Sequence, residues 1–220
     1  MTRTTPLLQL TDVGRRYGER WVVRAVTLDL APAECVALVG GNGAGKSTLL
    51  RLAAGREEPT EGQVSFAGGP VGEDDPALRA RVATVMDPGA HYPDLTVREH
   101  LMLVALAHGP EAAAGAAVDR ALAEHRLAEH AHALPSALSS GQTQAMLLAS
   151  AFVRPHDLLI LDEPEQRLDA RARKELGRRL AAHKERGTAI LLATHHEALA
   201  DAVADRVLAL EDGTPVGAGH

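Results

Sequence analysis

Short apolar runs, separated by glycine, proline or aspartate, mark the N-terminal third of the chain as a series of strands. The runs are LLQLTDV, WVVRAVTLDL and CVALVG, and CVALV is expected to be the most deeply buried. Valine and leucine runs bounded by turn-forming residues are typical of β-strands. Directly after the third run, apolar residues recur at helical spacing in TLLRLAAG, which ends on Gly55. The pattern predicts a strand, a glycine-rich loop and a helix in succession.

Helical spacing then dominates the middle of the chain. After a short apolar strand, RVATVM, helices are predicted over Val97–Ala107, Glu111–His132 and Gly141–Phe152. Alternation resumes with the strand LLILDEP, a helix over Asp169–Arg186, the strand TAILLAT, a short helix and RVLALEDGTPV, in which DGTP forms a hairpin turn. Strands that alternate with helices predict an α/β fold with a mostly parallel sheet, here interrupted by a helical insert.

Composition and charge exclude several classes of protein. The chain has 220 residues, a net charge of −6 and 45% apolar residues, which fits one large domain. Its acidity and its two Tyr, two Phe and one Trp argue against general nucleic-acid binding, so no nucleic-acid partner is expected. The apolar stretches Leu101–Ala107 and Ala145–Val153 are shorter than the roughly 18 to 20 residues that span a bilayer. The sequence MTRTTPLLQL resembles no secretory signal and Cys35 is the only cysteine, so a cytoplasmic setting is expected.

The segment GGNGAGKS, Gly40–Ser47, matches the phosphate-binding pattern G-x-x-x-x-G-K-[ST], between a predicted strand and a predicted helix. Its glycines allow backbone N–H groups to curl around the β- and γ-phosphates, at the partly positive N-terminus of the helix. Lys46 would meet phosphate oxygens, and the Ser47 hydroxyl could bind Mg²⁺. The predicted nucleotide-binding residues here are Gly40, Gly41, Asn42, Gly43, Ala44, Gly45, Lys46, Ser47 and Thr48.

The strand LLILDEP carries the acidic residues expected to act together with this loop. Four apolar residues predict a buried strand that carries Asp162 and Glu163 to its C-terminal edge, where open α/β sheets bind ligands. Asp162 would hold Mg²⁺ through water. Glu163 is placed to act as the general base that polarises an attacking water.

A third motif, LSSGQ, Leu138–Gln142, opens the helix before that strand. With it the chain closely resembles the nucleotide-binding subunit of ATP-binding cassette (ABC) transporters, whose signature usually reads LSGGQ. The resemblance spans nearly the whole chain, with the motifs in the family's order. It implies one domain, 1–220, with a P-loop NTPase core and an N-terminal antiparallel β subdomain in 1–86 and 155–220. The helical insert that carries the signature would occupy about 87–154.

The family resemblance also implies roles for single residues. The signature of one protomer would close over ATP held by a second protomer, as a homodimer or a heterodimer. His195 matches the switch histidine that contacts the γ-phosphate, and the neighbouring His196 is expected to face solvent. Tyr17 matches the aromatic residue that stacks on adenine, with packing in the sheet as the alternative. The implied signature contacts to ATP are Ser139, Ser140, Gly141 and Gln142.

Several positions depart from the family pattern. Asp87 stands where the family has a glutamine, and its carboxylate could bind Mg²⁺ directly. Ser140 replaces a glycine, and Ala33 replaces a turn glycine, which we interpret as structural only. In EQRLD, Glu165 and Arg167 replace small residues. Either the loop tolerates change and Arg167 neutralises Glu165, or the acidic changes tune the pair of cassettes for slow hydrolysis or for a different partner cassette.

The usual partner in this family is a membrane permease. The segment His91–Leu101 is where the resemblance places the groove that receives it, with Tyr92, Leu95 and Val97 as candidate contacts and packing inside the helical insert as the alternative for the last two. The chain is therefore expected to hydrolyse ATP and to power a membrane transporter from the cytoplasmic face. Two alternatives remain open: a weakly hydrolysing half of a heterodimer, and a soluble ATPase of the same family that takes no part in transport.

Overall fold

The computed structural model describes residues 5–72, 75–87 and 89–216. Residues 1–4 and 217–220, which belong to the predicted domain 1–220, and residues 73–74 and 88 lie outside the described residues. Within the described ranges, none of the helices has the length and apolar character needed to cross a membrane.

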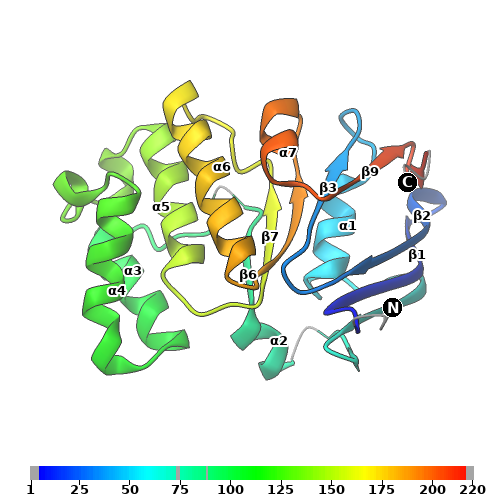
Figure 1. The fold of residues 1–220 in the computed structure, drawn as a ribbon, viewed down its shortest axis with the longest axis horizontal. Helices are drawn as coiled ribbons and strands as arrows, with labels where there is room; N and C mark the ends of the chain where they lie inside the picture. Colours follow the sequence, from blue (N-terminus) through cyan, green and yellow to red (C-terminus); the bar gives the residue numbers. More distant parts are fainter. Residues whose placement is uncertain (1–4, 73–74, 88, 217–220) are drawn as a thin grey trace.

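A six-stranded sheet forms the centre of the molecule (Figure 1). Its strand order is β10-β9-β3-β8-β7-β6, and all neighbours are parallel except the pair β9 and β10. The mostly parallel sheet and the terminal hairpin are therefore confirmed. The strands are β3 (Cys35–Val39), β6 (Val82–Val85), β7 (Leu158–Asp162), β8 (Ala189–Ala193), β9 (Arg206–Glu211) and β10 (Thr214–Pro215).

A second, antiparallel sheet lies beside the first and has the order β2-β1-β4-β5. Its strands are β1 (Leu8–Tyr17), β2 (Arg20–Leu30), β4 (Glu61–Phe66) and β5 (Gly69–Pro70). This confirms the N-terminal antiparallel subdomain. The hydrophobic pattern did not indicate β4, β5 or the short helix α2 (Pro76–Arg81), because β4 begins with the polar residues EGQ and the other two elements are very short.

The remaining helices are α1 (Lys46–Ala53), α3 (Val97–His108), α4 (Glu111–Glu124), α5 (Ser140–Phe152), α6 (Ala170–Glu185) and α7 (Glu197–Val203). Helices α3, α4 and α5 gather on one side of the central sheet, opposite β1 and β2 (Figure 1). The helix predicted over Glu111–His132 is too long. It ends at Glu124 because Arg126 adopts a left-handed backbone with φ 56°, and a short 3₁₀ turn, Ala128–His130, follows.

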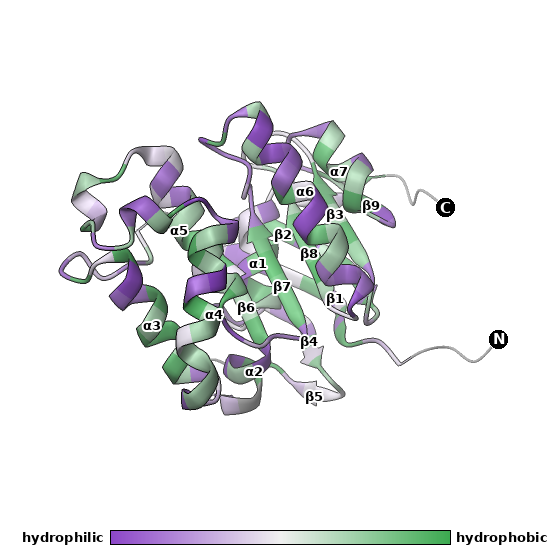
Figure 2. Ribbon diagram, turned by 60° about the vertical axis from the view of Figure 1, so that its left-hand side comes forward, coloured by the Kyte–Doolittle hydropathy of each residue, from purple (hydrophilic) through white to green (hydrophobic). Residues whose placement is uncertain are grey.

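The central strands β7 and β8 are buried on both faces. Figure 2 colours these strands as hydrophobic. Side chains alternate across a strand, so Ile160 of β7 joins α1 and the antiparallel sheet in one core. Its neighbour Leu161 packs on the other face with α5, α6 and α7. A third core holds α3 and α4 together, and α5 contributes side chains to both of these last two cores.

His125 is buried at the end of α4, against the ring of Phe152 at a centroid distance of 5.5 Å. Burial lowers the pKa of His125 to about 3, and nearby Arg179 and His183 act in the same direction. The unfolded chain binds a proton at this position below about pH 6.5, whereas the folded chain does so only near pH 3. Its contribution to stability is therefore complete above pH 6.5 and is lost as the pH falls.

We expect wild type to lose about 2 kcal/mol more unfolding free energy than His125→Leu when the pH is lowered from 7 to 5. Leucine keeps an apolar contact with Phe152, and His183 is present in both chains, so its own titration cancels. Urea unfolding of both chains at the two pH values measures the difference. An equal loss in the two chains would show that His125 is not the titrating group.

Candidate functional site

The glycine-rich loop follows β3 in a conformation that its glycines make possible. Gly40 and Gly45 adopt φ values of 149° and 93°. A Cβ atom at Gly40 would lie 2.2 Å from the carbonyl oxygen of Leu210, and one at Gly45 would lie 2.5 Å from that of Val22. Any side chain at either position would clash with backbone, so the loop keeps its shape only with glycine there.

Lys46 begins α1, and the loop wraps around its side chain. Its Nζ donates hydrogen bonds to the carbonyl oxygens of Gly40 at 2.8 Å and Gly41 at 3.1 Å, and only 5% of the residue is exposed. An adjoining pocket of about 190 Å³ is lined by Val22, Asn42, Gly43, Ala44, Gly45, Lys46, Ser47, Thr48 and Glu163. The predicted loop residues therefore form one concave surface that carries a fixed positive charge.

The predicted metal ligands lie in a second cleft of about 200 Å³. Ser47, Asp87 and Asp162 all line it. Burial raises the pKa of Asp162, while a hydrogen bond from Ser47 acts in the opposite direction. Asp87 is exposed, and its Oδ1 accepts the N–H of Gly89 at 2.8 Å. Three oxygen-bearing side chains from separate parts of the sequence thus share one cleft.

Glu163 follows β7 with an unusual left-handed backbone, φ 46°, and its N–H donates to the carbonyl oxygen of Ala193 at 2.9 Å. One carboxylate oxygen lies 2.6 Å from Nε2 of His195, and the other accepts a hydrogen bond from Gln166. The same Nε2 lies 3.3 Å from Nζ of Lys46. Lys46, Glu163 and His195 therefore converge at the carboxyl edge of the parallel sheet.

Two neighbours of these residues differ from expectation. Gln166 was not among the predicted site residues, although its position three residues after Glu163 in a turn brings the two side chains together. His196 was expected to face solvent, but it is half-buried and lines a groove between α6 and α7, because its N–H is held by the Thr194 hydroxyl at 3.0 Å.

Of the two alternatives for the loop after Glu163, the one in which Arg167 neutralises Glu165 is not supported. Glu165 is 8% exposed and accepts a hydrogen bond from the Thr194 hydroxyl, while its Oε2 has no partner in the described chain. Glu165 points inward from its loop toward the end of β8, so it cannot meet the Arg167 side chain. Glu165 is therefore the buried position of a loop in which Gln166, Arg167 and Asp169 are exposed.

The signature residues lie at the start of α5. Ser139 caps the helix, because its hydroxyl oxygen accepts the N–H of Gln142 at 3.3 Å. The side-chain oxygen of Gln142 in turn accepts the N–H of Ser139 at 2.8 Å, and its Nε2 contacts His130. The capping leaves the N–H groups of Ser140 and Gly141 without intrahelical partners. None of the four signature residues lines the loop pocket or the metal cleft. The signature donors therefore belong to neither of these two pockets, although Gln144, further along α5, lines the metal cleft.

The other predicted contact residues differ in exposure. Tyr17 ends β1, is 43% exposed and donates a hydrogen bond to Glu57, so it is not packed inside the sheet. In the segment His91–Leu101, Tyr92 is 56% exposed and Leu95 is half-buried. Val97 is fully buried in the core of α3 and α4, so its prediction as a permease contact is wrong and the packing alternative holds.

Comparisons with known proteins agree with this geometry. Residues 23–166 match the family model described as ABC transporter. The Nod factor export ATP-binding protein I of Paraburkholderia xenovorans is 37% identical over 213 residues, which cover 96% of this chain and 70% of the relative. The protein of the same name from Bradyrhizobium diazoefficiens is 34% identical and covers 100% and 72%.

Solved structures are similar over nearly the whole chain. The ATP-binding subunit of an ABC transporter superposes with a TM-score of 0.89 and 33% identity, covering 96% of this chain and 88% of that one. A dimeric bacterial ABC transporter cassette gives 0.87 and 25%, covering 96% and 97%. Together with the loop, the paired acidic residues and the signature, these similarities establish that the chain belongs to the ABC transporter family of ATPases, as an ATP-binding subunit.

Proposed function

We propose that two copies of this chain, or this chain and a second cassette, close over ATP and that ATP hydrolysis reopens them to power a membrane transporter. The observation that carries the proposal is the separation of the loop from the signature: the signature residues line neither the loop pocket nor the metal cleft. A γ-phosphate held by the loop can meet a signature only when a second chain supplies one. The likeness to a dimeric cassette and to export ATP-binding proteins supports this arrangement.

The loop and α1 would bind the nucleotide. Backbone N–H groups at a helix N-terminus and the ammonium group of Lys46 are both suited to phosphate oxygens. The exposed Tyr17 ring would stack on adenine. The remaining loop residues, from Gly40 to Thr48, would shape the pocket around the phosphates.

The cleft beside the loop fits Mg²⁺. Its donor set consists of the Ser47 hydroxyl and the carboxylates of Asp162 and Asp87, and oxygen ligands are those that Mg²⁺ prefers. Burial raises the pKa of Asp162 and so disfavours its charged form, and a bound cation would act in the opposite direction. When bound, Mg²⁺ would supply positive charge to the phosphate oxygens.

Glu163 would accept the proton of the attacking water. A general base must lie within hydrogen-bonding reach of that water, and Glu163 is the carboxylate that lines both the loop pocket and the metal cleft. The 2.6 Å contact with His195 and the bond from Gln166 fix both of its oxygens. His195 would position Glu163 relative to the γ-phosphate, because its Nε2 lies within 2.6 Å of Glu163 and 3.3 Å of Lys46.

The permease would dock on the helical unit, about 87–154. The segment around His91–Leu101 leads directly from the metal cleft at Asp87 into α3 and exposes Tyr92. Tyr92 and Leu95 are the contact residues that remain after the burial of Val97 is taken into account. Docking there would hold the cassette at the membrane surface and transmit closure to the permease.

We expect Ser139→Asp to lower ATP turnover at least tenfold while the affinity of the single chain for ATP changes less than twofold. Aspartate caps helices as well as serine does, so α5 keeps its start, but its charge would repel a γ-phosphate held by the partner. Ser136→Asp, an exposed residue in the turn before the signature, is the matched control. Turnover and calorimetric ATP affinity are measured for both variants. Unchanged turnover, or a loss of affinity in the single chain, would contradict a site shared between two chains.

A further inference from the structure

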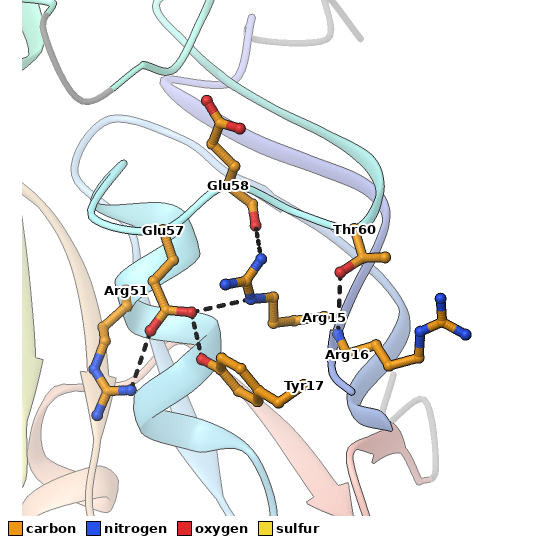
Figure 3. Close-up of polar contacts among 7 residues, drawn as sticks. All are labelled: Arg15, Arg16, Tyr17, Arg51, Glu57, Glu58 and Thr60. Carbon is orange, nitrogen blue, oxygen red and sulfur yellow. Dashed lines mark hydrogen bonds and ion pairs between the residues drawn. The ribbon is translucent and has the colours of Figure 1, made fainter. Parts of the chain in front are cut away.

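The carboxylate of Glu57 is the centre of a polar cluster beside Tyr17 (Figure 3). It accepts hydrogen bonds from the hydroxyl of Tyr17, from Nε of Arg15 at 3.1 Å and from Nη1 of Arg51 at 3.3 Å. Its side chain is only 19% exposed, although the Tyr17 residue is 43% exposed. Both carboxylate oxygens are therefore engaged by donors that come from two different elements, β1 and α1.

Arg15 also contacts the tyrosine ring. Its Cζ lies 4.8 Å from the ring centroid, which is within range of a cation–π contact. The guanidinium is itself fixed by Glu57 and by the backbone carbonyl oxygen of Glu58 at 2.9 Å. Figure 3 shows the Glu58 carboxylate and the Arg16 side chain turned away from this cluster. The Tyr17 ring is thus restrained at its hydroxyl and over one face, and still keeps exposed surface.

The cluster also connects the ring to the helix that carries the phosphate loop. Arg51 lies five residues after Lys46 in α1, a distance of about 7.5 Å along the helix axis. Through Arg51 and Glu57, the ring is fixed relative to α1 and not only to its own hairpin. A ring in a fixed position costs less conformational entropy when a base stacks on it.

From these contacts we propose that Glu57 is a positioning residue for the nucleotide base: it holds the Tyr17 ring, through the hydroxyl and through Arg15, in place for stacking. The inference rests on the proposed stacking of Tyr17 on adenine. It concerns affinity for the base and leaves the phosphate contacts of the loop unchanged.

The test compares ATP with inorganic tripolyphosphate, which has the phosphates but no base, by calorimetric titration of the full chain. Glu57→Gln should raise the Kd for ATP about 5- to 10-fold and leave the Kd for tripolyphosphate within twofold. Tyr17→Phe keeps the ring and its contact with Arg15 and removes only the hydroxyl, so it should give a smaller loss of the same kind. Because both changes disturb the hydroxyl contact, the loss of ATP affinity in the double variant should be smaller than the product of the two single losses. Glu58→Gln is the matched control and should bind both ligands as wild type does.

The outcomes separate this inference from the function on which it rests. Tyr17→Ala should weaken ATP binding tenfold or more. If it has no effect, the proposed stacking of Tyr17 on adenine is itself contradicted. If Tyr17→Ala weakens binding but Glu57→Gln does not, only the inference is overturned. An equal loss for ATP and tripolyphosphate, or additive effects in the double variant, would also overturn it. Should Glu57→Gln fail to fold, the comparison of the two ligands with Tyr17→Phe decides the matter.

Discussion

Replacing Glu163 by glutamine is expected to lower the rate of ATP hydrolysis by about three orders of magnitude, with ATP affinity changed less than about twofold. An amide of the same size fits the same space and keeps one acceptor oxygen toward His195 or Gln166, but it cannot accept a proton, and general-base catalysis contributes a factor of this order. A loss confined to turnover identifies an interaction made in the transition state. Phosphate release and calorimetric titration with ATP measure the two quantities, and Glu197→Gln, an exposed glutamate in α7, is the control.

The same variant should also trap the closed pair. If closure requires ATP and reopening requires hydrolysis, Glu163→Gln should sediment as a dimer with ATP and as a monomer with ADP or without nucleotide. Dimers that form equally well without ATP would contradict closure driven by the nucleotide. Turnover that persists in the variant would assign the base to another residue.

Replacing Lys46 by alanine is expected to weaken ATP binding about 100-fold. The ammonium group provides charge-assisted hydrogen bonds to phosphate, which are worth about 1.5 to 3 kcal/mol each. Its removal also leaves the carbonyl oxygens of Gly40 and Gly41 without their donor, so the loop loses an internal support. ATP titration measures the loss, and thermal melting without nucleotide verifies that the chain is folded.

The exposed lysine of α6, Lys174, provides the matched change to alanine and should leave ATP binding as in wild type. A Lys46→Ala chain that melts normally and binds ATP as tightly as wild type would rule out the phosphate contact. Its turnover, measured at saturating ATP, then indicates whether the lysine also acts during hydrolysis.

The nucleotide loop and the paired acidic residues could be predicted because their signals are local. Glycine at Gly40 and Gly45 and the sequence Asp162–Glu163 after an apolar strand each specify a conformation within a few residues. The parallel sheet then brings these segments to one edge. The order of the strands and helices along the chain and the parallel direction of the strands were sufficient to predict which segments meet.

Contacts between distant side chains could not be predicted in the same way. Glu57 and Tyr17 are 40 residues apart, and Glu165 and Thr194 are 29 apart, so no local pattern couples them. The early end of α4 depends on a left-handed Arg126, a conformation that no local residue preference favours for arginine. The burial of Glu165 depends on the hydroxyl at the end of β8, which only the folded chain brings into reach.

The position of α5 has a mechanical consequence. One face of this helix packs with β7, which ends at Asp162, and the other face packs with α3 and α4. A helix enclosed on two sides by close-packed side chains transmits strain to both neighbours, because such packing is hard to compress. If a second chain pressed on its signature end, the strain would reach the acidic residues after β7 and the helices α3 and α4 at the same time. Under the proposed function, this one helix would couple the site of hydrolysis to the permease.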